Sequence, residues 1–490
     1  ESGPKMPPGD PENHEPYLLP RGGTLLVTTA GPVQFGVPPE TIKDTLPLAC
    51  GVPKIFVIGE QFFSYSRGIT LADVEFPIFF NFFIRQQRCT IICTEEQKER
   101  VKQFMQESMF GPLSVDLDAD VQGLAADYDW CPDLKKEMDS FSQNPFKPGC
   151  RMGYDDFVEF HTFDSDLGTV EALGITFRLT EDHKFEIHDT AANKVVSIDR
   201  DVTLPPKLQE PDTRRHTFER PIFGVSVLGR GHGFDPNTKT TGFILWANRH
   251  GILVDPPVDS TEYLKAHELP ARAADAIILT HCHADHCGGT LQKILQADRV
   301  RLYTTPTIYA SFLRKAEAIT GLPMHRFTSI LDYRPVPINK PVFINGAEFI
   351  FNYTIHSIPC IQIEAHLGGK SLVYSSDTLN EPEAFKSMEE AGILSSERTQ
   401  HLLSFPWHHD LIIHEAGVPP IHTSTARLGA LTEDIKSRMY LVHTTESALP
   451  EGVGLRLAPL GLENTLELAA KKPTHHDATE WIRAMRAVDH

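Results

Sequence analysis

The sequence is poor in cysteine, with eight residues in a chain of 490, and it contains no CxxC pair. So few cysteines exclude a disulfide scaffold of the kind that small secreted domains use in place of a large core. They predict a reducing, cytoplasmic setting in which the thiols are mostly buried and inert. Because the chain starts at Glu1 rather than Met, N-terminal processing stays open.

Long apolar runs are also absent. The most apolar stretch, residues 76–84 (FPIFFNFFI), is far shorter than the stretch of about 20 residues that a membrane-spanning helix needs. The sequence therefore predicts no membrane span. The run at residues 76–84 is interpreted as a buried strand.

Positive charge is in deficit. The chain has 46 Lys and Arg against 65 Asp and Glu, which gives a formal net charge of −19. A nucleic-acid-binding protein normally presents a basic face, so nucleic acid is not the expected partner. The deficit is uneven, with −14 in residues 1–200 and −5 in residues 201–490. This difference predicts a domain boundary near residue 200.

The length of the chain predicts more than one domain, because a single core rarely grows past about 250–300 residues. The segment PPKLQEP at residues 205–211 interrupts the pattern and marks the boundary. Four divisions are predicted: a disordered arm at residues 1–20, an N-terminal α/β domain at 21–210, a second α/β domain at 211–465, and a C-terminal tail with a helix at 466–490.

Within the N-terminal domain, residues 112–140 are dense in aspartate. The DLDAD spacing resembles part of a calcium loop, but the central Gly and the terminal Glu of such a loop are misplaced. A solvated acidic linker is the favoured interpretation. The residues of this domain leave open whether it covers a site, forms a homodimer interface or binds a regulator.

The clearest chemical signal is the run THCHADHCGG at residues 280–289, directly after an apolar strand. Its imidazole and carboxylate groups suit Zn²⁺ and similar ions. Because side chains alternate along an extended chain, His281 and His283 point the same way and can share one metal. Asp285 and His286 come round the following turn and can serve a second.

Further ligand-type residues follow three later strands. His356 comes after residues 349–355, Asp377 after residues 371–374 and His443 after residues 439–442. Strand ends of this kind gather along one rim of a sheet, where binding sites collect. Asp377 can bridge two metals through its two oxygens, and His356 and His443 would complete the two ligand sets.

These residues, together with Asp255 in LVDPP, stand in the order found in the metallo-β-lactamase superfamily, which the sequence resembles over residues 221–460. The resemblance implies an αββα sandwich with two divalent metals at one edge, most often zinc, with manganese or iron as alternatives. It also implies that one metal is held by His281, His283 and His356, that the other is held by Asp285, His286 and His443, and that Asp377 bridges them.

Two variants of this superfamily do not match. Flavodiiron members usually have Glu where this chain has His283, and true β-lactamases have Cys where it has Asp377. A hydrolytic centre is therefore favoured. One departure is Ser376, in SSDT, where relatives usually have SGDT.

The segment DLIIHEA at residues 410–416, the HSIPC segment and the GRGHG turn look like the tRNase Z and cyclic-nucleotide phosphodiesterase branch. That likeness implies a general acid or phosphate contact at His414, oriented by Glu415, while Asp285 steers the proton of the attacking water. The candidate substrate-binding residues are His232, His422 and Arg456. These three residues and His414 each have a structural alternative. His414 would cap a strand, His232 would form a hydrogen bond within its turn, and His422 and Arg456 would serve in packing.

The predicted activity is hydrolysis of a small phosphodiester, such as a cyclic nucleotide, at a dinuclear metal site. Two metals would neutralise developing charge and activate a water, and a histidine would protonate the departing oxygen. A thioester or lactone hydrolase of the same fold remains an alternative, as does a tRNase Z-like nuclease. The net charge and the absence of a basic, glycine-rich insertion disfavour the nuclease. The intact ligand set disfavours a non-catalytic binding protein.

Overall fold

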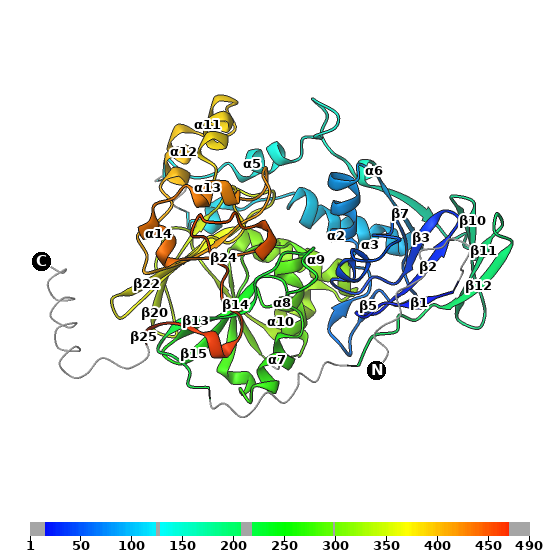
Figure 1. The fold of residues 1–490 in the computed structure, drawn as a ribbon, viewed down its shortest axis with the longest axis horizontal. Helices are drawn as coiled ribbons and strands as arrows, with labels where there is room; N and C mark the ends of the chain where they lie inside the picture. Colours follow the sequence, from blue (N-terminus) through cyan, green and yellow to red (C-terminus); the bar gives the residue numbers. More distant parts are fainter. Residues whose placement is uncertain (1–14, 124–127, 207–217, 297–298, 470–490) are drawn as a thin grey trace, which may run out of the picture.

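The computed structural model describes residues 15–123, 128–206, 218–296 and 299–469 (Figure 1). In the second half of the chain, two sheets face each other. The first consists, in spatial order, of β18 (Leu331–Pro335), β17 (Val300–Thr304), β16 (Ala274–Ile278), β15 (His250–Val254), β14 (Gly242–Ala247), β13 (Phe223–Gly229) and β25 (Leu466–Ala469). The second consists of β19 (Val342–Ile344), β20 (Ala347–Tyr353), β21 (Ile361–Leu367), β22 (Lys370–Tyr374), β23 (Leu411–Glu415) and β24 (Met439–Val442).

The two sheets meet through apolar side chains. Phe243 on β14 contacts Tyr374 on β22 edge to face, with 4.9 Å between the ring centroids. β14 is buried along its whole length, so helices must cover the outer side of its sheet as well. This is the predicted αββα sandwich. The helices of this half are α7 (Ser260–Ala266), α8 (Ala284–Gln296), α9 (Pro306–Thr320), α10 (Met324–Ile330), α11 (Pro382–Glu390), α12 (Ser396–Leu403), α13 (Thr425–Gly429) and α14 (Glu433–Arg438).

The N-terminal half is an α/β unit, shown in Figure 1 in colours that run from blue through cyan to blue-green. Its main sheet has the order β1 (Tyr17–Leu18), β2 (Thr24–Thr28), β3 (Gly31–Phe35), β4 (Ile55–Val57), β7 (Cys89–Cys93) and β8 (Val158–Thr162). A smaller antiparallel sheet packs on it: β12 (Lys194–Asp199), β11 (Lys184–Asp189), β10 (Ile175–Leu179) and β9 (Thr169–Ala172). The remaining elements are the hairpin β5 (Phe63–Ser64) and β6 (Ile69–Thr70) and the helices α1 (Ile42–Thr45), α2 (Glu75–Phe79), α3 (Glu95–Met105), α4 (Leu117–Asp120), α5 (Leu134–Phe141) and α6 (Tyr154–Phe157).

The apolar run at residues 76–84, predicted as a strand, is helical: it lies in α2 and in a π-helical turn, Phe80–Ile84, that continues it. Helical spacing explains the difference. Ile78 and Phe82, four residues apart, are buried together, while Phe83 is 37% exposed on the other side. Nowhere in the described ranges is a helix long and apolar enough to cross a bilayer.

Both predicted chain ends differ from the structure where it describes them. Residues 17–18, placed in the disordered arm, form β1 and pair with β2. Residues 466–469, placed in the C-terminal tail, form β25 and pair with β13. A sheet edge satisfies the backbone groups of such short segments, which composition alone does not reveal. The other parts of the arm and tail, with Trp481, lie outside the described residues, as does most of the predicted boundary at residues 205–211.

The main sheets of the two halves share one strand plan. In each, three antiparallel strands are followed by three parallel ones in sequence order, and the second sheet adds β25 beside β13 at its edge. The turn after the third strand also agrees: Gly36 and Asp255 both have positive φ, 69° and 43°. The N–H groups of these two residues donate to the last carbonyl of the fourth strand, on Val57 and Ile278, at 2.9 and 3.1 Å.

The equivalent helices that follow the fifth strands, α3 and α9, pack on each other. Arg100 of α3 donates to the carbonyls of Ala318 and Ile319 at the end of α9, at 2.9 and 2.8 Å. Buried apolar side chains run continuously from one half into the other. The halves therefore contact each other through matching surfaces, as subunits do across a two-fold axis.

The acidic segment at residues 112–140 is not a solvated linker. In Figure 1 it runs in cyan from the N-terminal half to α11 and α12. Asp120 is fully buried and accepts hydrogen bonds from the backbone N–H of Thr307 (3.0 Å) and the hydroxyl of Tyr353 (2.8 Å). Glu137 forms a buried ion pair with Arg398 at 2.9 Å. These long-range partners fasten the segment to the second half, although Asp116, Asp118, Asp129 and Asp133 stay exposed and Asp127 lies outside the described residues.

We expect Glu137→Ala to lower the free energy of unfolding by about 3–5 kcal/mol, because it leaves the buried Arg398 guanidinium without its carboxylate. Denaturant unfolding measures the change. Lys135→Ala, an exposed position of the same helix, is the control. Equal unfolding midpoints for the two variants would contradict the prediction.

Candidate metal centre

The first group of ligand atoms comes from the ends of β16 and β20. His281 and His283 follow β16, His356 follows β20, and all three are buried. Nδ1 of His283 lies 3.1 Å from Nε2 of His281 and 3.2 Å from Nε2 of His356. Two nitrogens that share a tetrahedral zinc ion stand about 3.3 Å apart. The spacing of these three imidazoles therefore suits one metal ion.

The second group lies beside the first. Nε2 of His443, after β24, stands 3.3 Å from Asp285 Oδ2, and Nε2 of His286 stands 3.4 Å from Asp377 Oδ1. His286 Nε2 and Asp377 Oδ1 are buried and have no hydrogen-bond partner among the residues that the structure describes. Leaving a buried polar atom unpaired costs about 1–3 kcal/mol. Both atoms therefore fit the second metal ion that the ligand set implies.

Asp377 faces both groups. Its Oδ1 points to His286, while its Oδ2 lies 3.7 Å from His281 Nε2, 3.8 Å from His356 Nε2 and 3.7 Å from His443 Nε2. A carboxylate in this position can bridge two ions. The structure thus brings all seven predicted ligands into one cluster.

Neighbouring groups fix the orientation of the ligand imidazoles. His286 Nδ1 donates to Asp255 Oδ2 at 2.9 Å, and the hydroxyl of Thr280 donates to the same oxygen at 2.5 Å. His356 Nδ1 donates to the carbonyl of Ile421 at 3.0 Å. Such partners select the tautomer whose other nitrogen is free to bind a metal. This is the role of Asp255, for which the sequence predicted no function.

Left-handed backbone conformations collect at the same strand ends. Asp255, Ser376 and His443 have φ values of 43°, 50° and 58°. Such a conformation costs a non-glycine residue about 1–3 kcal/mol and is frequent at functional sites. It explains why glycine is expected at position 376. Serine is held there by a contact of 3.1 Å between its hydroxyl and the thiol of Cys360.

The histidines of the first group are neutral. Burial lowers the pKa of His281 and His283 far below its usual value and that of His356 to about 4. Neutral imidazole is the form that binds metals. Burial also acts to lower the pKa of His443, but Asp377 and Asp285 outweigh it and raise that pKa to about 9. The second group is therefore the more strongly anionic surrounding, which suits a cation.

His414 does not face this cluster. Its Nδ1 donates to the carbonyl of Glu415 at 2.6 Å, and its Nε2 accepts from the amide of Asn380 at 3.3 Å. Its ring stacks on Trp407, with 5.5 Å between centroids. The predicted general acid at His414 is therefore misplaced. Side chains alternate along a strand, so only one residue of the His414–Glu415 pair can face the metals.

Glu415 is the residue that faces them, and its partner is His422. The Glu415 carboxylate lies 3.1 Å from His422 Nδ1 and accepts the N–H of Thr423 at 2.7 Å. The His422 ring stacks on that of His443 at 4.5 Å, and its Nδ1 is 3.9 Å from Asp377 Oδ2. Glu415 thus orients His422 rather than His414. Strand alternation could have revealed that only one of His414 and Glu415 faces the metals, but not that the partner of Glu415 is His422.

Comparison with known proteins identifies relatives of this chain. The family described as Anti-Pycsar protein Apyc1 matches residues 223–453. The cGMP-dependent 3',5'-cGMP phosphodiesterase A of Dictyostelium discoideum is 34% identical over 96% of this chain and 68% of its own length. The chain belongs to the family of this phosphodiesterase, in the metallo-β-lactamase superfamily. It is a metal-dependent hydrolase.

Two further similarities complete the comparison. The cAMP/cGMP-dependent 3',5'-cAMP/cGMP phosphodiesterase B of the same organism is 33% identical over 94% of this chain, which spans 46% of that protein. The crystal structure of YhfI from Bacillus subtilis, a metallo-β-lactamase fold protein, is 18% identical with a TM-score of 0.36 and covers 49% of this chain and 98% of its own.

Of the other predicted substrate contacts, the structure places one at the hydrolase site and one away from it. The ring of His232 is 5.8 Å from that of His443, and its Nδ1 also accepts the N–H of Phe234 at 3.1 Å. Arg456 contacts the carbonyls of Ser437 and Met439, before and at the start of β24, whereas His443 follows the end of that strand. Arg456 is therefore a structural residue at the wrong end of β24.

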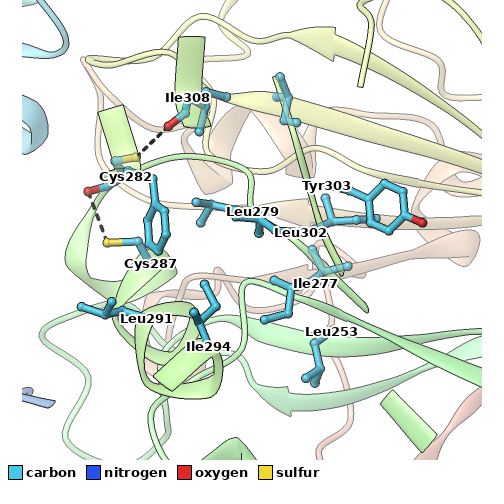
Figure 2. Close-up of a cluster of buried hydrophobic side chains, with 14 of the residues drawn as sticks. Leu253, Ile277, Leu279, Cys282, Cys287, Leu291, Ile294, Leu302, Tyr303 and Ile308 are labelled. Carbon is cyan, nitrogen blue, oxygen red and sulfur yellow. Dashed lines mark hydrogen bonds between the residues drawn. The ribbon is translucent and has the colours of Figure 1, made fainter. Parts of the chain in front are cut away.

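The cysteines that flank the ligands belong to the core beneath the loop (Figure 2). Cys282 directs its thiol to the carbonyl of Ile308 at 3.7 Å, and Cys287 directs its thiol to the carbonyl of Cys282 at 3.6 Å. Burial raises the pKa of Cys287 to about 11. A protonated thiol in an apolar setting is neither a metal ligand nor a nucleophile, so both cysteines serve as packing residues.

Proposed function

We propose that this chain hydrolyses 3',5'-cyclic nucleotides at a dinuclear zinc centre. The observation that carries the proposal is the pair of ligand groups joined by Asp377, in a chain that aligns along nearly its whole length with a cGMP phosphodiesterase. Zinc is favoured over manganese or iron because most of the ligands are imidazoles. The substrate assignment is supported by the activities of the two Dictyostelium relatives, a cGMP phosphodiesterase and a cAMP/cGMP phosphodiesterase.

The residues present define how the centre would work. His281, His283 and His356 would hold one ion, Asp285, His286 and His443 the other, and Asp377 both. When bound, the ions neutralise phosphate charge and make a water nucleophilic at neutral pH. In the reaction, water oxygen bonds to phosphorus, the bond from phosphorus to one ribose oxygen breaks, and a nucleoside monophosphate results.

Protons are handled by the chain itself. Asp285 is placed to accept the proton of the attacking water. Glu415 engages Nδ1 of His422 at 3.1 Å, which leaves Nε2 of His422 to face the departing ribose oxygen. Burial lowers the pKa of His422 to about 4, so the ring can protonate that oxygen only after the negative phosphate of the bound substrate has favoured its imidazolium form. His422 therefore takes the role that the sequence had suggested for His414.

The N-terminal half supplies an aromatic wall for a nucleobase. The ring of Phe79 meets His283 edge to face at 6.1 Å and stacks on Phe83 at 5.8 Å. Phe79 is partly exposed, and 37% of Phe83 is exposed. Flat apolar rings beside the ligands suit a purine better than they suit a bare phosphate ester.

We expect Phe79→Ala to raise the KM for cyclic nucleotides by about tenfold or more, because stacking of a base on an aromatic ring is worth about 1–3 kcal/mol. Initial rates at varied cyclic nucleotide concentration measure the change. Phe343→Ala, an exposed phenylalanine on β19 at the opposite end of the sheet from His356, is the control. An unchanged KM for Phe79→Ala would remove the base-stacking role.

The function is tested with purified, zinc-loaded protein. We expect it to convert cyclic AMP or cyclic GMP to a 5'-monophosphate, as followed by liquid chromatography. A chelator should abolish turnover and added zinc should restore it. Cleavage of a thioester or a lactone without cleavage of cyclic nucleotides would favour the ester hydrolase, and processing of precursor tRNA would favour the nuclease. Homodimer formation and a cytoplasmic setting stay predictions, the first testable by sedimentation.

A further inference from the structure

A carboxylate of the N-terminal half reaches the backbone of the metal-ligand loop. Glu75, at the start of α2, is 1% exposed. Its Oε1 accepts the backbone N–H of Ala284 at 3.0 Å. Ala284 is the first residue of α8 and directly precedes Asp285. A free N–H at a helix start needs an acceptor and favours a negative one, which Glu75 provides from another part of the chain.

A buried lysine completes the connection. Lys315 of α9 is 2% exposed. Its Nζ donates to Glu75 Oε2 at 2.8 Å and to the carbonyl of Cys282 at 2.6 Å. Cys282 and Ala284 are the two neighbours of His283. The ion pair therefore holds the backbone on both sides of one metal ligand.

The location of the pair argues for positioning rather than for stability. Removing two opposite charges from water costs several kcal/mol, and replacing a buried pair by apolar residues is often neutral for stability. Groups that orient metal ligands, by contrast, set metal affinity, and their loss costs about 10–100-fold. This buried pair is hydrogen-bonded to the backbone of Cys282 and Ala284 in the ligand loop, which matches the second description.

We propose that Glu75 is a positioning residue through which the N-terminal half, acting with Lys315, sets the metal affinity of the loop at residues 281–286. The inference deepens the proposed function and rests on it only in taking the loop to hold metal. It gives the N-terminal half a role that its sequence left open. This half is part of the metal centre rather than only a cover over it.

The test measures zinc affinity without substrate, by competition with a chromogenic chelator. Glu75→Gln keeps an acceptor for Ala284 but leaves Lys315 without its counter-charge, and it should raise the zinc Kd by about 10–100-fold. Glu107→Gln is the matched control. Glu107 is also buried in the N-terminal half and also pairs with α9, through Arg314 at 2.6 Å and Ser311 at 2.6 Å, but these bonds end on side chains of α9 and not on the backbone of the ligand loop. It should leave the Kd unchanged.

A second variant covers the case in which Glu75→Gln does not fold. The double replacement Glu75→Leu with Lys315→Met removes both charges and keeps the volume, and it should still lose zinc affinity. Wild-type affinity in either variant, or an equal loss in Glu107→Gln, would overturn the proposal. Zinc binding is measured without substrate, so this test does not depend on turnover. A wild type that binds zinc normally but does not hydrolyse cyclic nucleotides would contradict the proposed function and not the role of Glu75.

Discussion

Replacement of Asp377 by alanine is expected to lower kcat/KM by about 10³-fold or more and to reduce the bound zinc from two ions per chain to one or none. Asp377 offers one oxygen to His286 and the other to His281, His356 and His443, so its loss removes a ligand from both positions at once. A metal contributes several kcal/mol of charge stabilisation to such a reaction, and about 1.4 kcal/mol corresponds to a factor of ten in rate.

Elemental analysis after gel filtration gives the metal content, and steady-state rates give the activity. Asp410→Ala is the control. Asp410 stands just before the start of β23 and pairs with Lys370 at 3.0 Å, whereas the metal ligands follow the C-terminal ends of the strands. It should keep both ions. Two tightly bound ions in Asp377→Ala would show that Asp377 is not the bridging ligand.

His422→Ala is expected to lower kcat for cyclic nucleotides by about 10²–10⁴-fold, the usual contribution of a general acid, without changing metal content. The effect should depend on the leaving group. A ribose oxygen needs a proton as it departs, whereas p-nitrophenolate does not. Hydrolysis of bis-p-nitrophenyl phosphate should therefore be nearly unaffected by the substitution.

Two further variants sharpen this prediction. Glu415→Gln should show the same dependence on the leaving group, with a smaller loss, because it weakens the group that orients His422. His408→Ala, at an exposed position, should behave as the wild type. Equal losses on both substrates in His422→Ala would assign His422 to substrate binding or to the metal instead of proton transfer.

The metal ligands could be predicted from the sequence because each follows an apolar strand, and such strands end along one rim. The pairing of Glu415 with His422 was not predicted, since it depends on which face of β23 each residue takes and on a partner from the next loop. The prediction that Arg456 binds substrate was wrong for a related reason. Its proximity to His443 in sequence conceals a position at the other end of β24.

In the N-terminal half, predictions from local composition were wrong for residues whose contacts lie far away in the sequence. Asp120 belongs to a segment whose acidic composition predicts exposure to solvent, yet it is buried against Thr307 and Tyr353, about two hundred residues away. The run at residues 76–84 is apolar enough for a strand, but its burial follows helical spacing. Glu75, beside it, carried no signal at all, because its partners are a lysine on α9 and the backbone of the ligand loop.

The shared strand plan of the two halves has a consequence for how the contact between them behaves when the protein is diluted. Two separate chains that met through α3 and α9 would come apart at low concentration, and any contact across that surface would go with them. Here the two halves are joined in one chain, so each is present to the other at a fixed, high effective concentration. The contact from Glu75 to the ligand loop, and the zinc affinity that depends on it, should therefore be the same at nanomolar as at micromolar protein. The face of α9 that α3 covers is closed to a second chain.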